Sequence, residues 1–211
     1  IIVDSGKFDW AKDPKRQPML NNPDPSYHGM IWTEFAKAVG PIAYIVRARF
    51  VGLRDLGPAL SPQSAFQIIQ GLETVSLRME KHCSNAEKVA EYLSSHNKVS
   101  KVIYAGLDEG EAGERANKYL KGGHGALCGF ELKGGKASGE KFINNLNMFY
   151  HVANIGDARS LAIHPATTTH SQLSDEDMES AGVNPSYVRL SIGIEHIDDI
   201  IEDLKNALDT A

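Results

Sequence analysis

The sequence has little that would mark a secreted or membrane protein. It contains two cysteines in 211 residues, Cys83 and Cys128, which lie far apart in helical or apolar patterns. This spacing favours buried thiols in a reducing compartment over a disulfide framework. No apolar run approaches the ~18 residues of a membrane span, and the first residues lack the pattern of a signal peptide. We therefore expect a cytoplasmic protein that has no membrane partner.

The sequence also lacks an excess of basic residues. Lys and Arg total 22 against 27 Asp and Glu, which gives a formal net charge of −5 at pH 7. No basic run with interleaved aromatic residues is present, and both observations argue against a nucleic-acid partner. A length of 211 residues is ample for one hydrophobic core and could hold two subdomains.

The longest predicted element is a helix that begins after Ser61. Ser61 is a good N-cap, Pro62 is tolerated at the first helical position, and apolar residues then recur at helical spacing as far as Leu93. At ~1.5 Å per residue, one helix from Pro62 to Leu93 would be about 48 Å long. Before it, residues 1–4 predict a short strand closed by a turn, and the proline-rich residues 11–29 predict a long loop.

Strands and helices alternate over residues 97–211. Period-2 patterns predict strands at 99–107, 126–132 and 187–192, and helical spacing predicts helices at 111–120, 138–149, after Ser174 and from Ile197. This order predicts an α/β fold, with helices packed against a small, largely antiparallel sheet.

Residues 154–170 and Arg189 form the candidate site. Residues 154–170 are rich in Gly, Pro, Thr and His and lack a helical period, so they predict short extended segments and tight turns. Alternation places Val188 and Leu190 on one face of a strand and Arg189 on the other. An arginine on a rigid strand can bind a carboxylate, at roughly 1.5–3 kcal/mol per charge-assisted hydrogen bond. A surface arginine on a half-exposed strand is the alternative that spacing leaves open.

The sequence gives little support to three other kinds of site: a metal site, a serine-hydrolase site and a phosphate loop. His151, His164 and His170 do not have the spacing of a helical His pair or a zinc knuckle, so no metal site is expected. No Gly-x-Ser-x-Gly elbow is present for a serine hydrolase. The run at 121–125 resembles a phosphate loop but lacks the flanking strand, helix and GKS/T ending, which favours a simple turn.

Several motifs are spread over nearly the whole chain. They are IIVDSGKFDW (1–10), LRDLG (53–57), QGLET (70–74), SLRM (76–79) and the segments 154–170 and 188–195. Together they resemble the C-terminal half of the Cys/Met-metabolism family of pyridoxal-phosphate (PLP) enzymes. Within this family the O-acetylhomoserine sulfhydrylase branch fits best, because Arg159 stands where cystathionine-handling relatives usually have an acid and QGLET replaces a common RGLKT.

The resemblance implies the C-terminal part of a fold-type-I PLP-dependent transferase. Residues 1–60 would be the tail of the PLP-binding domain, 61–96 a long connecting helix and 97–211 the substrate domain. Arg189 would hold the substrate α-carboxylate with Ser160 beside it, and Asn154 and Thr169 would support them through hydrogen bonds. The implied reaction is γ-replacement of acetate on O-acetylhomoserine by sulfide to give homocysteine, in a homotetramer.

The resemblance also implies that the Schiff-base lysine and most PLP-binding residues lie upstream of this chain. We therefore expect no catalytic and no cofactor-binding residue here, and we expect the isolated chain to be inactive. The Ser-x-x-Lys sequence at Ser95–Lys98 ends a helical pattern and is not followed by an aromatic residue, so we interpret it as a chance match to the family's lysine motif. The alternatives are a methionine or cystathionine γ-lyase of the same family, and a non-catalytic α/β interaction module.

Overall fold

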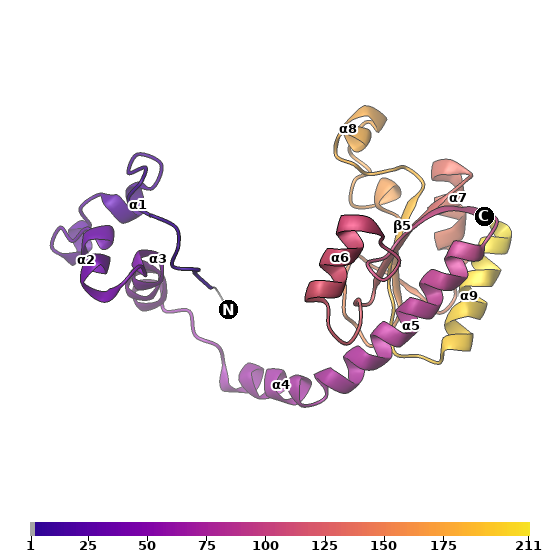
Figure 1. The fold of residues 1–211 in the computed structure, drawn as a ribbon, viewed down its shortest axis with the longest axis horizontal. Coiled ribbons are helices and arrows are strands. Elements are labelled where there is room, and N and C mark those ends of the chain that lie inside the picture. Colours follow the sequence, from indigo (N-terminus) through magenta and orange to yellow (C-terminus); the bar gives the residue numbers. More distant parts are fainter. Residues whose placement is uncertain (1–2) are drawn as a thin grey trace. The chain divides into compact units, whose positions relative to one another are not determined.

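The computed structural model describes residues 3–211. The chain forms two compact units, Ile1–Ile69 and Gln70–Ala211 (Figure 1). The division of roles among residues 1–60, 61–96 and 97–211 stays a prediction. Among the described residues, no helix combines the length and the apolar character needed to cross a membrane.

The first unit is built from short helices around a small core. Its elements are α1 (Pro18–Asn21), η1 (Pro25–Tyr27), α2 (Trp32–Val39), α3 (Ala43–Arg47) and the π-helical segment η2 (Ala48–Asp55). The core contains Leu20, Trp32 and Val46, and Trp32 Nε1 donates to the Asp24 carboxylate at 3.1 Å. Residues 11–29, predicted as one loop, thus contain two helical turns, each with proline at its start, where the missing N–H is tolerated.

The first residues of this unit form a turn. The strand predicted over residues 1–4 lies partly outside the described residues, and Val3 and Asp4 are not in a strand. The Asp4 carboxylate instead accepts from the Gly6 amide at 3.0 Å and from Trp10 Nε1 at 3.1 Å. Gly6 has a φ of 68°, which confirms the turn predicted there.

The single long helix predicted from Pro62 to Leu93 is wrong. The structure has α4 (Pro62–Glu73) and α5 (Val75–Ser95), separated at Thr74 with φ −113° and ψ 7°. In a continuous helix the Gly71 carbonyl would accept from the residue-75 amide. Here it accepts from Arg78 Nη2 at 2.6 Å. The predicted cap is confirmed, since Ser61 Oγ accepts from the Ser64 amide at 3.1 Å.

The second unit contains a five-stranded sheet in the order β1-β2-β5-β4-β3. Neighbouring strands are antiparallel except β3 and β4, which are parallel. The predicted α/β class and largely antiparallel sheet are confirmed. The strands are β1 (Val99–Ile103), β2 (Leu127–Leu132), β3 (Tyr150–His151), β4 (Leu161–Ile163) and β5 (Tyr187–Ser191).

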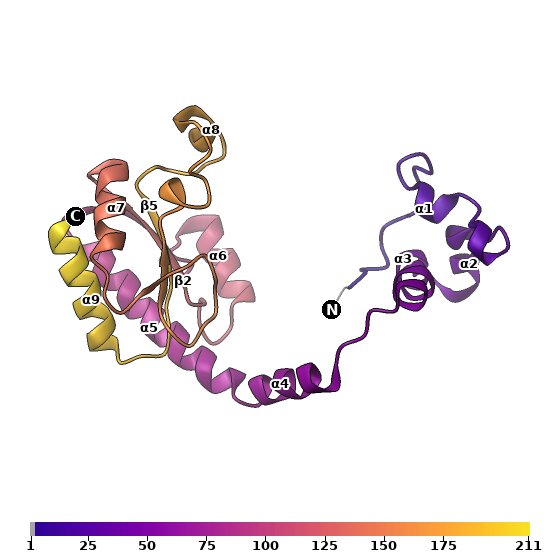
Figure 2. The same cartoon turned by 180° about the vertical axis from the view of Figure 1, so that it is seen from behind.

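Helices α5 and α7 contact one face of this sheet, and α9 packs against both helices in the same hydrophobic core. Figures 1 and 2 show them together on that side, with α6 on the other. The remaining elements are α6 (Gly110–Tyr119), α7 (Gly135–Asn144), η3 (Pro165–Thr167), α8 (Asp175–Ser180) and α9 (Ile197–Thr210). Alternate residues of β2 and β5 point into the core, where Cys128, Phe130, Val188 and Leu190 are completely buried. Burial raises the pKa of the Cys128 thiol to about 12. The predicted buried thiol is confirmed at Cys128, whereas Cys83 is only partly buried.

A buried carboxylate ends α7 five residues earlier than predicted. Asp203 of α9 accepts from the amides of Asn147 and Met148 at 2.9 Å and from that of Phe149 at 3.3 Å. These amides therefore do not donate within a helix, and α7 ends at Asn144 instead of continuing to Phe149.

Candidate functional site

Arg189 lies on the sheet face opposite the core. Its neighbours Val188 and Leu190 are fully buried, whereas Arg189 is half-buried. Its guanidinium Nη2 donates to the Ala153 carbonyl at 2.6 Å, with the Asn154 carbonyl at 3.4 Å. The side chain therefore extends toward the start of the 154–170 segment, as predicted.

The charge of Arg189 is not balanced by an acid among the side chains that the structure describes. Among the side chains that the structure describes (residues 3–211 without Asp175), no carboxylate lies within ion-pair distance of the guanidinium. Carbonyl oxygens are its partners, and they neutralise no charge. An uncompensated, partly buried guanidinium on a rigid strand favours an anionic ligand, and a carboxylate matches its paired donors.

The loop after β3 brings Asn154 beside Arg189. Gly156, with a φ of 77°, makes the turn, and its amide donates to Ser191 Oγ at 3.1 Å. This bond and the Arg189 contacts hold the loop against β5 at two points. The Asn154 side chain is exposed, so it is free to contact a ligand bound at the guanidinium.

Ser160 is placed differently from a simple ligand-binding serine. It is completely buried, and its Oγ donates to Glu195 Oε2 at 3.0 Å. Its amide donates to Glu195 Oε1 at 2.6 Å, and its Oγ accepts from the Gly193 amide at 2.9 Å. Both of its donors are thus engaged by one carboxylate. Sequence reasoning did not single out Glu195, although it lies at the end of the 188–195 segment.

Thr169 lies just after η3. It is exposed, and its Oγ1 forms a hydrogen bond of 2.9 Å with His170 Nδ1. Among the described residues, no hydrogen bond links Thr169 to Arg189 or Ser160. The structure therefore brings Asn154 next to Arg189 but does not join Thr169 to them.

His164 is a structural residue of the same segment. It is fully buried, with Nε2 2.8 Å from the Pro185 carbonyl and Nδ1 2.9 Å from Thr167 Oγ1. A carbonyl can only accept, so Nε2 carries the proton and Nδ1 accepts from the threonine. Burial lowers the pKa of His164, which keeps the ring neutral. Among the described residues, no group of three or more His, Cys, Asp or Glu is arranged to hold a metal.

Two sequences that resemble cofactor motifs, Ser95–Lys98 and residues 121–125, make structural contacts. Lys98 Nζ donates to the carbonyls of Leu208, Asp209 and Ala211 at the end of α9, at 2.8, 3.0 and 2.9 Å. In the 121–125 turn, a Cβ on Gly123 would collide with the Cys83 side chain. Lys98 is therefore a helix-capping cation, and its ammonium is not free to bind the carbonyl carbon of PLP.

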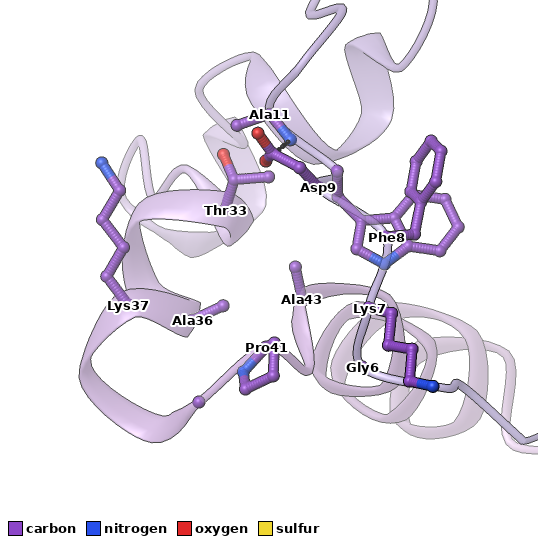
Figure 3. A pocket seen from close by; sticks show the side chains of 12 residues that line it. Gly6, Lys7, Phe8, Asp9, Ala11, Thr33, Ala36, Lys37, Pro41 and Ala43 are labelled. Carbon is purple, nitrogen blue, oxygen red and sulfur yellow. Dashed lines mark hydrogen bonds between the residues drawn. The ribbon is translucent and has the colours of Figure 1, made fainter.

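A pocket of about 510 Å³ lies in the first unit. Figure 3 shows Thr33, Ala36 and Lys37 of α2 on one side of it and the 6–11 segment on the other. Its lining contains none of the predicted site residues. The candidate site in the second unit consists of Arg189 and the loop beside it, on the sheet face opposite the core.

Known proteins resemble this chain over nearly all of its length. The family described as Cys/Met metabolism PLP-dependent enzyme matches residues 1–209. This chain belongs to that family. The chain is 51% identical, over 99% of its length, to an O-acetyl-L-homoserine sulfhydrylase of Leptospira meyeri. It is 49% identical, over its full length, to a homocysteine synthase of Schizosaccharomyces pombe.

A solved structure supports the same assignment. A crystal structure described as an O-acetylhomoserine (thiol)-lyase from Campylobacter jejuni, which carries a pyridoxyl-lysine phosphate group, matches with a TM-score of 0.78 and 43% identity. The match covers 94% of this chain and 46% of that one. The chain likewise spans 48% of the length of the Leptospira and Schizosaccharomyces relatives. The predicted fold-type and family are confirmed, and the chain corresponds to about half of such an enzyme.

Proposed function

We propose that this chain is the C-terminal part of a PLP-dependent O-acetylhomoserine sulfhydrylase. The observation that carries the proposal is 49–51% identity, over at least 99% of the chain, to two relatives named for this chemistry. The reaction is γ-replacement: sulfide displaces acetate from O-acetylhomoserine, and homocysteine is formed.

Arg189 would supply the main contact to the amino-acid substrate. Its guanidinium is fixed by β5 and by the Ala153 carbonyl, and it has no acidic partner among the described side chains. A substrate α-carboxylate bound there would place the Cα–H bond in one orientation, which contributes positioning to the reaction. The exposed Asn154 side chain would add a hydrogen bond at the same place. Ser160 and Thr169 stay proposed as supporting residues.

The cofactor's own chemistry needs residues that this chain does not supply. PLP, when bound, serves as the electron sink for negative charge at the substrate Cα. The motif-like lysine Lys98 is fixed by three carbonyls, so it does not fit the role of the Schiff-base residue. We therefore propose that the chain contributes substrate binding, that PLP is held mainly by the other half of the enzyme, and that the chain alone is inactive.

The decisive test is a product assay on the complete enzyme that contains this chain. With O-acetylhomoserine and sulfide, a sulfhydrylase releases acetate and homocysteine in equal amounts and no ammonia. Ammonia and a keto acid released from methionine or cystathionine would instead support the γ-lyase alternative. The homotetramer and the cytoplasmic location remain predictions, to be checked by sedimentation and by cell fractionation.

A further inference from the structure

The segment that joins β5 to α9 is bonded on both of its sides. Toward the candidate site, the Gly193 amide donates to Ser160 Oγ at 2.9 Å, and the Ile194 amide donates to the Ala158 carbonyl at 2.9 Å. Both bonds end on residues 158–160, which close the loop that begins beside Arg189. The position of this segment therefore fixes the end of the loop.

Two side chains of α5 hold the other side of this segment. His82 Nδ1 is 2.6 Å from the Ile192 carbonyl, and the ring is buried. Asn85 Nδ2 donates to the carbonyls of Gly193 and Glu195 at 3.0 and 2.9 Å. Since α5 is anchored in the core, residues 192–195 are attached to a rigid element.

Glu195 extends this connection to the candidate site. Its carboxylate accepts both donors of Ser160, the amide at 2.6 Å and the hydroxyl at 3.0 Å. Two hydrogen bonds to one ionised group fix the Ser160 backbone as well as its side chain, and bonds to a charged acceptor are among the stronger ones in proteins. Lysine or arginine would compete with Ser160 for this carboxylate, but none of the described ion pairs involves it.

Gly193 makes this contact sterically possible. A Cβ at residue 193 would collide with the Glu195 carboxylate, the Ala158 carbonyl and the Ser160 amide at once. Two of these three groups are backbone, so they could not move aside without displacing the loop. The room left by glycine, and not an unusual backbone angle, is what residue 193 supplies.

We propose that Glu195 is a positioning residue for the substrate site. By accepting from both donors of Ser160, it fixes the 154–160 loop against β5, and so places Asn154 and the Arg189 guanidinium for carboxylate binding. Glu195 touches neither substrate nor cofactor in this role. The proposal deepens the proposed function and depends on it for its reaction role.

The test compares variants at two positions that act on one contact. Glu195→Ala removes both acceptors, Gly193→Ala pushes the carboxylate away, and Glu195→Gln keeps one acceptor for the Ser160 amide. Glu202→Ala is the matched control, because Glu202 is an exposed residue of α9. Steady-state kinetics with O-acetylhomoserine are measured on the complete enzyme. Hydrogen exchange of the Ser160 amide is measured on the same samples.

We expect Glu195→Ala and Gly193→Ala to raise KM for O-acetylhomoserine about ten-fold or more, with a much smaller change in kcat. The Ser160 amide should exchange faster in both variants. Glu195→Gln should be intermediate in both readouts, and Glu202→Ala should match the wild type.

Unchanged KM and unchanged exchange in Glu195→Ala would overturn the positioning role. A fall in kcat and in folded fraction at constant KM would also overturn it, since that is the result of a purely structural residue. If the wild-type complete enzyme releases no acetate from O-acetylhomoserine while Ser160 exchange still responds, the proposed function is wrong. The reaction role of Glu195 is then lost with it, and only the hydrogen bonds remain.

Discussion

Arg189 is the residue whose removal should affect substrate binding most. In the complete enzyme, Arg189→Ala should raise KM for O-acetylhomoserine by at least about ten-fold, because the substrate carboxylate loses its charged partner. A ten-fold rise corresponds to about 1.4 kcal/mol of binding free energy. Arg189→Lys should be intermediate, since lysine keeps the charge but not the paired donors. Steady-state kinetics check this, with Arg115→Ala as the control because Arg115 is exposed on α6. An unchanged KM in Arg189→Ala would remove the carboxylate role.

His164 should make the stability of the second unit depend on pH. Burial lowers its pKa in the folded chain, whereas in the unfolded chain the pKa is about 6.5. The unfolded state therefore binds more protons below about pH 6.5, and acid favours unfolding. The stabilisation by neutral His164 is fully present above that pH and is lost as the pH falls toward the folded pKa.

Urea denaturation at pH 7.5 and 5.5 tests this sign. The loss of unfolding free energy between the two pH values should be smaller in His164→Gln than in the wild type. The variant should also be less stable at pH 7.5, because the Pro185 carbonyl and Thr167 hydroxyl lose well-placed partners. The same pH dependence in both proteins would show that His164 is not the group responsible.

At the scale of elements, Asp203 connects α9 to the chain that follows α7. Asp203→Ala would leave three amides without an acceptor, the partly buried ones of residues 147 and 148 and the buried one of residue 149. An unsatisfied buried donor costs roughly 1–3 kcal/mol, and water can reach the two partly buried amides, so we expect a total loss of about 2–4 kcal/mol in unfolding free energy.

Chemical denaturation of Asp203→Ala against Glu202→Ala measures this loss. Glu202 lies on the same helix but is exposed, so its removal should change the unfolding free energy by less than about 0.5 kcal/mol. Asp203→Asn should be intermediate, because an amide keeps one of the two acceptor oxygens. Equal stability of the two alanine variants would contradict a stabilising role for Asp203.

Element prediction succeeded where hydrogen bonds are local and failed where a distant group intervened. The cap at Ser61, the helix after Ser174 and the alternating faces of β2 and β5 are as predicted, because they depend on residues a few positions apart. The predicted end of α7 is wrong because the Asp203 carboxylate, more than fifty residues away, accepts from the amides of residues 147–149. At the break at Thr74, the Arg78 side chain donates to the Gly71 carbonyl. The periodicity of apolar residues does not predict this contact.

At the scale of the whole molecule, the chain matches about half of each relative. We expect the isolated chain to release no acetate from O-acetylhomoserine. Adding PLP and then borohydride should give no stoichiometric pyridoxyl adduct, because Lys98 is engaged by three carbonyls and Lys141, in the other Ser-x-x-Lys sequence (138–141), is an exposed residue of α7. A stoichiometric pyridoxyl adduct in the mass spectrum would contradict this expectation.

The candidate site was predictable only in part. The sequence points to Arg189 because strand alternation and the neighbouring apolar residues are local properties, and the structure places its guanidinium beside residues 153 and 154. It also marks the 154–170 segment, through its Gly, Pro, Thr and His content. It does not distinguish Asn154, which lies at the arginine, from Thr169, which has no hydrogen bond to it in the described residues.

The sequence by itself determined the family, the α/β class and, over residues 97–211, the order of the three longer strands and the four helices. Motifs, periodicity and caps depend on residues that are close together in the sequence, so they can be recognised without three-dimensional information. Only the tertiary structure decided that Ser160 is buried and that Glu195, 35 residues away, binds both of its donors. The reason is physical: a hydrogen bond between distant residues depends on how strands and helices pack, and no local pattern records that packing.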